Sequence, residues 1–71
     1  MDKKICISYD HQADVMYLSF DESAKAEAEE IEDGVFARYE SKTHALVGLT
    51  ITNFSRKFGM ELKEVVVPIY A

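Results

Sequence analysis

Apolar residues recur at every second position in several short stretches of this chain, and that alternation constrains the fold more than any other feature. Ile5, Ile7 and Tyr9 form the first stretch, and residues 15–20 form the second. Because successive side chains of a β-strand point to opposite faces, a period of two predicts strands that turn one face toward a core. The polar segment 10–12 separates the two stretches, so we expect a hairpin.

The same alternation returns in the middle of the chain. One run covers residues 35–40 and another covers residues 45–52, with the polar loop 41–44 between them. Two alternating runs joined by a short polar loop favour a second hairpin. Asp33 and Gly34 precede the first of these runs and predict a turn or bulge, because glycine adopts positive φ without steric cost.

Residues 22–32 carry conflicting signals. Alanine, glutamate and lysine dominate the segment and are strong helix formers, and Ser23 is placed to cap a first turn. The apolar face of such a helix would hold only Ala24, Ala28 and Ile31, and helices draw most of their stability from packing that face. Intrinsic propensity favours a helix and the packing argument opposes it, so both alternatives stay open at this point.

The C-terminal third predicts one short helix followed by an extended tail. Asn53 or Ser55 can cap one or two helical turns that end at Phe58, and Gly59 stands where a C-terminal cap is expected. Residues 65–70 then form a β-branched run whose proline lacks an N–H, which confines such a run to a sheet edge or a bulge. We expect this tail to be available for pairing with another chain.

The 71 residues leave room for one hydrophobic core, and we interpret residues 1–71 as a single domain. A chain this short buries only about 60% of the surface that its unfolded form exposes, so its stability alone is expected to be marginal. Its one cysteine, Cys6, forms no intrachain disulfide, and one cysteine with two histidines cannot supply a four-ligand zinc site. We therefore expect no metal or cofactor, and self-association into a homo-oligomer.

No segment predicts export or a membrane. The first residues of the chain contain too few apolar side chains for a signal peptide, and no run approaches the roughly 20 apolar residues of a membrane helix. A lone cysteine is typical of a reducing compartment. The sequence therefore predicts a cytoplasmic protein.

Negative charge is concentrated in one part of the chain. The net charge is −5, but residues 21–40 hold eight acids against two bases, and the remainder of the chain holds five acids and six bases. A negative field of this kind repels phosphate backbones, so we expect no direct binding of nucleic acid. A small basic protein would be attracted to this segment.

Three pieces of the sequence, in this order, resemble a known family: residues 9–18, YDHQADVMYL; residues 30–35, EIEDGV; and residues 46–51, LVGLTI. They resemble the bacterial and archaeal domain-of-unknown-function family 2283. Its pattern is a Tyr-Asp-x-x-Ala-Asp-x-x-Tyr opening, an acidic stretch that ends in Asp-Gly, and a Val-Gly-Ile-Glu-Ile strand. The likeness spans residues 5–58.

The resemblance implies that the acidic stretch is extended, so residues 26–32 are predicted to be a strand. The predicted fold is α+β, a small and mainly antiparallel sheet of four to five strands with one short helix over residues 53–58. The family has no established activity. Some members look as though they are encoded beside small basic toxin-like proteins, which implies an antitoxin role with which the acidity of this chain is compatible.

Two groups of polar residues are candidate sites. The acids from Glu27 to Asp33 are candidates for docking lysine or arginine side chains of a partner, or else form a solvated edge that charge protects from aggregation. This acidic surface comprises Glu27, Glu29, Glu30, Glu32 and Asp33, and the predicted binding residues are the last four. On a regular strand, Glu29 and Ile31 would share one face while Glu30 and Glu32 share the other.

Asp10 and Asp14, with His11 between them, have the residue types of a ligand or acid-base cluster. The alternative is turn chemistry, in which Asp10 makes an Asx-type turn and Asp14 accepts backbone N–H groups at the start of the next strand. Aspartate at such places is typical of turns.

No spacing of residues indicates an enzyme, and the first hypothesis is a non-enzymatic protein-interaction module with an antitoxin-like role. The alternative is a self-assembling structural domain with no dedicated partner, or a ligand-binding domain whose site lies at a subunit interface. An enzyme that uses Asp10, His11 and Asp14 ranks last.

Overall fold

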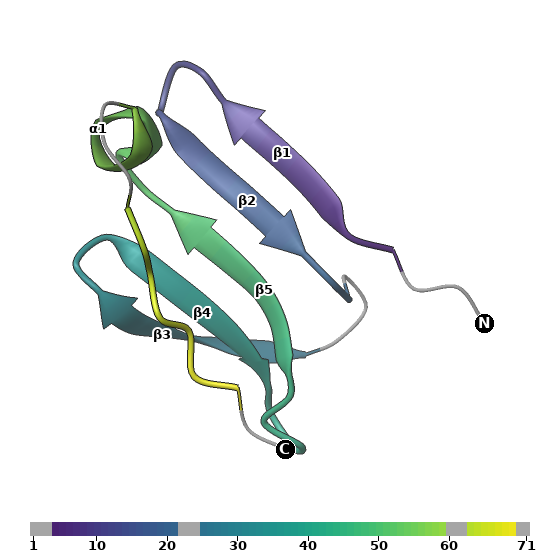
Figure 1. The fold of residues 1–71 in the computed structure, drawn as a ribbon. Coiled ribbons are helices and arrows are strands. Elements are labelled where there is room, and N and C mark those ends of the chain that lie inside the picture. Colours follow the sequence, from purple (N-terminus) through teal and green to yellow (C-terminus); the bar gives the residue numbers. More distant parts are fainter. Residues whose placement is uncertain (1–3, 22–24, 60–62, 70–71) are drawn as a thin grey trace.

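The computed structural model describes residues 4–21, 25–59 and 63–69. Across these ranges the chain forms one five-stranded sheet, in which every neighbouring pair of strands is antiparallel, and one short helix (Figure 1). The elements are β1 (Cys6–Asp10), β2 (Val15–Ser19), β3 (Ala26–Glu32), β4 (Val35–Glu40), β5 (Leu46–Ile51) and α1 (Phe54–Phe58). The strands lie in the order β1-β2-β5-β4-β3.

The predicted fold is confirmed in its coarse form, as an antiparallel sheet with one short helix in the C-terminal third. Both predicted hairpins are present, since β1 pairs with β2 and β4 pairs with β5. Within the ambiguous acidic stretch, residues 26–32 form the strand β3, as the family resemblance implied, and pair with β4, whereas residues 22–24, with the predicted cap Ser23, lie outside the described residues. The helix-forming composition of this stretch is overridden because β3 aligns on the buried strand β4, whereas a lone helix would have packed only three small or medium apolar side chains.

The strand order makes β1 and β3 the two edges of the sheet. Strands β3, β4 and β5 follow one another as hairpins, and β5 returns to lie beside β2, which gives the four strands β2 to β5 a Greek-key arrangement. Strands β2 and β3, which follow one another in the sequence, therefore lie on opposite sides of the β5–β4 pair, as Figure 1 shows. The two edge strands, β1 and β3, thereby lie on opposite sides of the sheet.

The pairing register sorts the side chains of the sheet onto two faces. Ile7 lies opposite Leu18, Leu18 opposite Leu49, and Leu49 opposite Ala37, so these four side chains form one row across the sheet. We call this side the apolar face; its strand residues are Ile7, Tyr9, Met16, Leu18, Leu49, Ile51, Val35, Ala37 and Tyr39. The opposite face carries Cys6, Ser8, Tyr17, Ser19, Gly48, Thr50, Phe36 and Arg38.

The core lies on the apolar face over the two central strands. Its buried side chains are Val35, Ala37, Tyr39, Val47 and Ile51. The C-terminal tail, residues 63–69, runs across this part of the face (Figure 1) and is tied to it by the Tyr39 hydroxyl, which donates a hydrogen bond of 2.7 Å to the carbonyl of Pro68. Half of the sheet thus gains a partial second layer from its own chain.

In the C-terminal third the predicted positions of the two helix caps are confirmed, and the strand character expected of the tail is wrong. The described part of the predicted β-branched run, residues 65–69, has no strand structure and crosses its own sheet as irregular chain; residue 70 lies outside the described residues. Asn53 does stand at the helix N-cap, but with φ 50° and with no side-chain capping bond, and Gly59 ends the helix in a right-handed conformation. In the described ranges no helix has the length and apolarity that crossing a membrane requires.

Candidate functional site

The acidic residues of β3 lie along one exposed edge of the sheet. Among the described residues β3 pairs with β4 alone, so its outer edge joins no other strand. Glu27 lies opposite Tyr39 and Glu29 lies opposite Ala37, which puts both carboxylates on the apolar face. The edge strand therefore presents acids beside the core, not only toward solvent.

A bulge changes the face of the last acid in β3. The register shifts between Glu30 and Glu32, so Glu32 lies opposite Val35 on the apolar face. The prediction that Glu32 shares a face with Glu30 is wrong, because a bulge residue at Ile31 reverses the alternation that a regular strand would keep. Bulges of this kind are typical of sheet edges.

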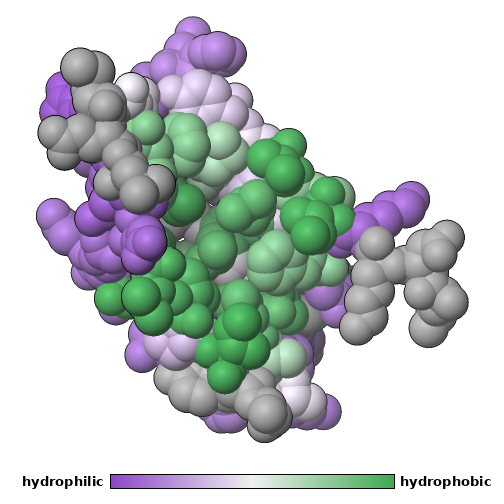
Figure 2. Space-filling model, in the orientation of Figure 1, coloured by the Kyte–Doolittle hydropathy of each residue, from purple (hydrophilic) through white to green (hydrophobic). Residues whose placement is uncertain are grey.

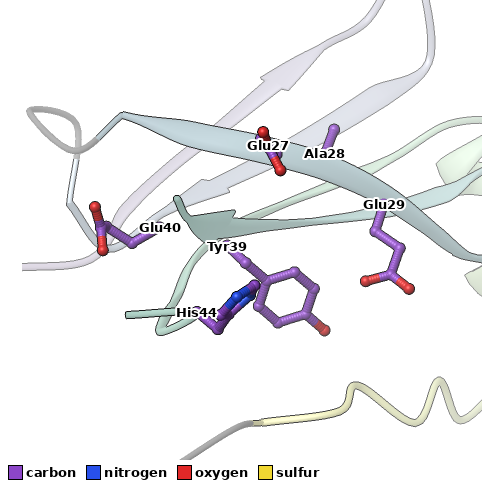
Figure 3. Close-up of a pocket in the computed structure, with 6 residues that line it drawn as sticks. All are labelled: Glu27, Ala28, Glu29, Tyr39, Glu40 and His44. Carbon is purple, nitrogen blue, oxygen red and sulfur yellow. The ribbon is translucent and has the colours of Figure 1, made fainter. Parts of the chain in front are cut away.

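A hollow of about 270 Å³ opens beside these carboxylates. Its lining comes from β3, β4 and the loop after β4, and comprises Glu27, Ala28, Glu29, Tyr39, Glu40 and His44. Figure 3 shows the Glu29 carboxylate and the Tyr39 ring extending to the same side of the β3–β4 pair, with the His44 ring beside Tyr39. The volume is below that of usual small-molecule pockets and suits one long side chain.

The four predicted docking residues do not act alike. Glu30 accepts a hydrogen bond of 3.1 Å from the Gly34 N–H and so holds the β3–β4 turn. Glu32 makes an ion pair of 2.8 Å with Lys63 of the tail. Asp33 is exposed in the turn itself. Only Glu29 lines the hollow.

Sequence reasoning placed Glu27 in the acidic docking surface but not among the four predicted binding residues, although it lines the same hollow as Glu29. The sequence did indicate that the two residues act together, since Glu27 and Glu29 are two positions apart and therefore share one face of a strand. Their significance depends on the register, which aligns both residues with the buried residues Tyr39 and Ala37 of β4.

The two aspartates of the opening motif have separate structural roles. Asp10 accepts hydrogen bonds from the N–H groups of Gln12 and Ala13, at 3.0 and 3.1 Å, which is the predicted Asx-type turn. Asp14 adopts φ 57°, and among the described residues its carboxylate accepts no hydrogen bond from the start of β2, where the prediction had placed its partners. It accepts instead from Ser55 of α1, at 3.0 Å from the N–H and 2.8 Å from the hydroxyl.

The Tyr9 hydroxyl donates a further hydrogen bond to Asp14, so the β1–β2 hairpin and α1 meet at one carboxylate. These bonds, from Tyr9 first and then from Ser55, lower the pKa of Asp14. The same bond to Asp14 raises the pKa of Tyr9, because it favours the neutral phenol. The Asp14 carboxylate thus performs the helix capping that the Asn53 side chain does not.

The remaining groups near this turn also make packing contacts. The ring of His11 lies edge-on to Tyr9 with centroids 5.1 Å apart, and Phe54 lies 5.7 Å from Tyr9 and 5.0 Å from Phe58. Within the described ranges no group of three or more histidine, cysteine, aspartate or glutamate side chains converges as metal ligands would. The interactions of Asp10 and Asp14 are those of turn and capping residues.

A family model for proteins of unknown function, DUF2283, matches residues 7–55. The chain belongs to the DUF2283 family. Neither the curated proteins nor the solved structures contain a match to it. The matched segment begins in β1 and ends at Ser55, so it contains both ends of the bond between Asp14 and α1.

This placement gives a physical account of part of the DUF2283 pattern in this chain. Asp10 shapes the first turn, Tyr9 and Asp14 fasten that turn to the helix, and Gly34 supplies a turn residue with φ 74°. The Gly34 carbonyl accepts the Thr52 N–H at 2.8 Å, just before the helix begins. The motif residues therefore join two hairpins to one short helix.

Proposed function

We propose that this DUF2283 protein is a protein-interaction module that receives a basic, extended segment of a partner along β3. The observation that carries the proposal is the outer edge of β3, which pairs with no other strand among the described residues, beside a hollow whose lining includes the β3 residues Glu27 and Glu29. A small basic protein is the partner that this chemistry fits, which would make the role antitoxin-like.

The open edge supplies the general part of the binding. An extended peptide adds to a sheet edge through main-chain hydrogen bonds, while the side chains that alternate along it give specificity. Strand β3 has seven residues, from Ala26 to Glu32, which is enough for such an added strand. A neutral or acidic segment would gain the same main-chain bonds without the charge attraction.

The carboxylates supply the specific part. A lysine or arginine side chain on the added strand would reach the hollow and meet Glu27 and Glu29 on the apolar face. Because the hollow is open to solvent, each such contact contributes little affinity by itself, and the attraction acts mainly on association rate and choice of partner. Binding is therefore expected to weaken as salt screens the charges.

A short synthetic peptide that alternates arginine and valine tests the proposal, with the matching glutamate–valine peptide as its control. NMR spectra of the labelled protein are expected to show shifts of the backbone amides of residues 26–32 with the basic peptide and not with the acidic one. The dissociation constant should rise by about tenfold or more between low and physiological salt if several ion pairs form.

Two charge-matched double variants identify the surface. Glu27→Gln with Glu29→Gln removes two negative charges from β3, and Cys6→Lys with Ser8→Lys adds two positive charges on exposed positions of β1. Both raise the net charge by two, so an effect of total charge alone would be equal in the two proteins. Binding lost only in the glutamine variant supports the proposal. Equal losses, or amide shifts outside β3, contradict it.

A further inference from the structure

The apolar face of the sheet is open over β1 and β2. Ile5 and Ile7 at this edge are 64% and 66% exposed, and Val66 and Ile69 of the tail are 82% and 74% exposed. Figure 2 shows apolar side chains gathered over this face of the molecule, seen from the same side as Figure 1. Exposed apolar side chains that gather on one face are typical of an interaction surface.

The open area is uncharged. On the apolar face the strand residues of β1 and β2 are Ile7, Tyr9, Met16 and Leu18. The acids of the chain are concentrated on β3 at the other edge of the sheet, about 19 Å from β1 and about 14 Å from β2 at the usual spacing of strands. A second copy can therefore approach the open area without bringing the two acidic edges together.

The exposed surface of the molecule is large for its mass. It measures 5624 Å², whereas a folded monomer of 8.1 kDa usually exposes about 4,500 Å². The difference, about 1,100 Å², exceeds the roughly 800 Å² that each partner buries in an interface of standard size. Over the chain as a whole, this excess is comparable with the surface that one subunit buries in a stable dimer.

We propose that a second copy of this chain covers the open part of the apolar face, so that two sheets pack face to face as a two-layer dimer. An apolar, uncharged patch can pack against a second copy of itself, since a contact with two-fold symmetry brings together the same patch from each subunit. The two sheets would lie about 10 Å apart, as in β-sandwiches. Pairing of the β1 edges alone would leave Ile5 and Ile7 exposed, which is why the contact is assigned to the face.

Sedimentation equilibrium of the whole chain over a range of protein concentrations tests the dimer. The wild-type mass is expected to rise from 8.1 kDa toward about 16 kDa. The double variant Ile5→Lys with Ile7→Lys puts charges on the apolar face and should raise the dissociation constant at least about 100-fold. These side chains are mostly exposed in one subunit, so the variant is expected to fold, as its amide spectrum would show.

The control is Cys6→Lys with Ser8→Lys, which adds the same two charges to the same strand on the opposite face. It should change the dissociation constant less than about threefold, since the net charge is that of the test variant. Isotope-filtered NMR of the wild type adds a measurement without mutation, with contacts expected between Ile7 methyl groups and the partner copy. A wild type that stays monomeric, equal dissociation of the two variants, or filtered spectra without Ile7 contacts would each overturn the proposal.

Discussion

The apolar face of this sheet has two halves that differ in how far they are covered. Over β4 the side chains of Val35 and Ala37 are 0% exposed, under the tail and beside β3 and β5. Over β1 the side chain of Ile7 is 66% exposed, although it belongs to the same face. The same alternating pattern therefore produces core in one half and surface in the other, and the difference comes from strand order and the course of the tail.

The two edge strands show a related difference. Edge β3 carries four glutamates and a bulge, both of which are known to discourage unplanned pairing of edges. Edge β1 has no lysine, proline or bulge within Cys6–Asp10, and every residue in it is exposed. An unprotected edge beside an open apolar face is consistent with a surface that another subunit covers.

The largest effect on stability is expected from a substitution in the turn between β3 and β4, which joins the covered half of the sheet to the helix. Gly34 has φ 74°, and an added Cβ would lie 2.5 Å from the Thr52 hydroxyl oxygen and 2.8 Å from the Lys57 Nζ. Thr52 cannot easily move, because its N–H and hydroxyl both donate to the Gly34 carbonyl at 2.8 Å. Gly34→Ala should lower the free energy of unfolding by about 3 kcal/mol, measured by urea denaturation.

The variant Gly34→Asn separates the two causes of that loss. Asparagine tolerates positive φ better than alanine but adds the same Cβ. A loss in Gly34→Asn close to that of Gly34→Ala would assign the cost to the contact with Thr52, and a much smaller loss would assign it to φ. A Gly34→Ala protein as stable as the wild type would show that this turn does not fasten the covered half.

The next largest effect is the loss of stability on truncating a side chain, which we compare between one residue in each half of the apolar face. Val35→Ala removes two methyl groups from a fully buried side chain and should cost about 2 kcal/mol of unfolding free energy. Ile7→Ala removes more atoms from an exposed side chain, and in a dilute monomer it should cost under about 0.5 kcal/mol. Urea denaturation of both variants at low protein concentration measures the difference.

Protein concentration sharpens this comparison. If a second copy covers Ile7, the stability of the wild type rises with concentration, and the cost of Ile7→Ala rises with it. The cost of Val35→Ala should not change, since Val35 is buried within one subunit. Equal costs of the two variants at low concentration would contradict the division of the face into covered and open halves.

The sequence predicted the strands well and the covering of the sheet poorly. Alternation around Ile7, Leu18, Val35 and Leu49 identified four strands because a period of two is local information. The strand order could not be obtained in that way, since it depends on which hairpins meet. The path of the tail was also missed, because a β-branched run predicts an extended chain without saying whether it pairs with a strand or crosses a face.

The candidate site was also predicted in part, where a residue's role depends on its near neighbours in the sequence. The turn role of Asp10 followed from its position, as two N–H donors two and three residues later confirm. The role of Asp14 required a partner 41 residues away in the chain, Ser55, which no local pattern indicates. The face of Glu32 depended on a bulge, and a bulge leaves no clear signal in a run of alternating acids.

The smallest expected effect concerns the fastening of the open half, and it appears as a dependence of stability on pH. The pKa of Asp14 is lowered in the folded protein from its ordinary value of 3.8, so its carboxylate stabilises the fold above that pH. This stabilisation is lost as the pH falls through the lowered pKa. The pKa of Tyr9 is raised from 10.0, so its phenol stabilises the fold below that pH, and this is lost as the pH rises through the raised pKa.

Thermal melts of the wild type and Asp14→Asn across both pH ranges test this bond. The melting temperature of Asp14→Asn should fall less on acidification than that of the wild type. At alkaline pH, most of the fall in melting temperature that ionisation of Tyr9 causes in the wild type should be absent from the variant. Part of the fall in melting temperature at acid pH should remain, because the pKa of Glu40 is also lowered, mainly by the hydrogen bond from the Thr43 N–H, and that carboxylate holds the loop beside the covered half.

Tyr9→Phe is the matched control. It removes the phenol but leaves the Ser55 bonds, so it should abolish the alkaline effect while retaining more of the acid effect than Asp14→Asn does. If Tyr9→Phe and Asp14→Asn gave the same acid profile, Ser55 would contribute nothing to the pKa of Asp14, and the hairpin would not be fastened to the helix through that carboxylate.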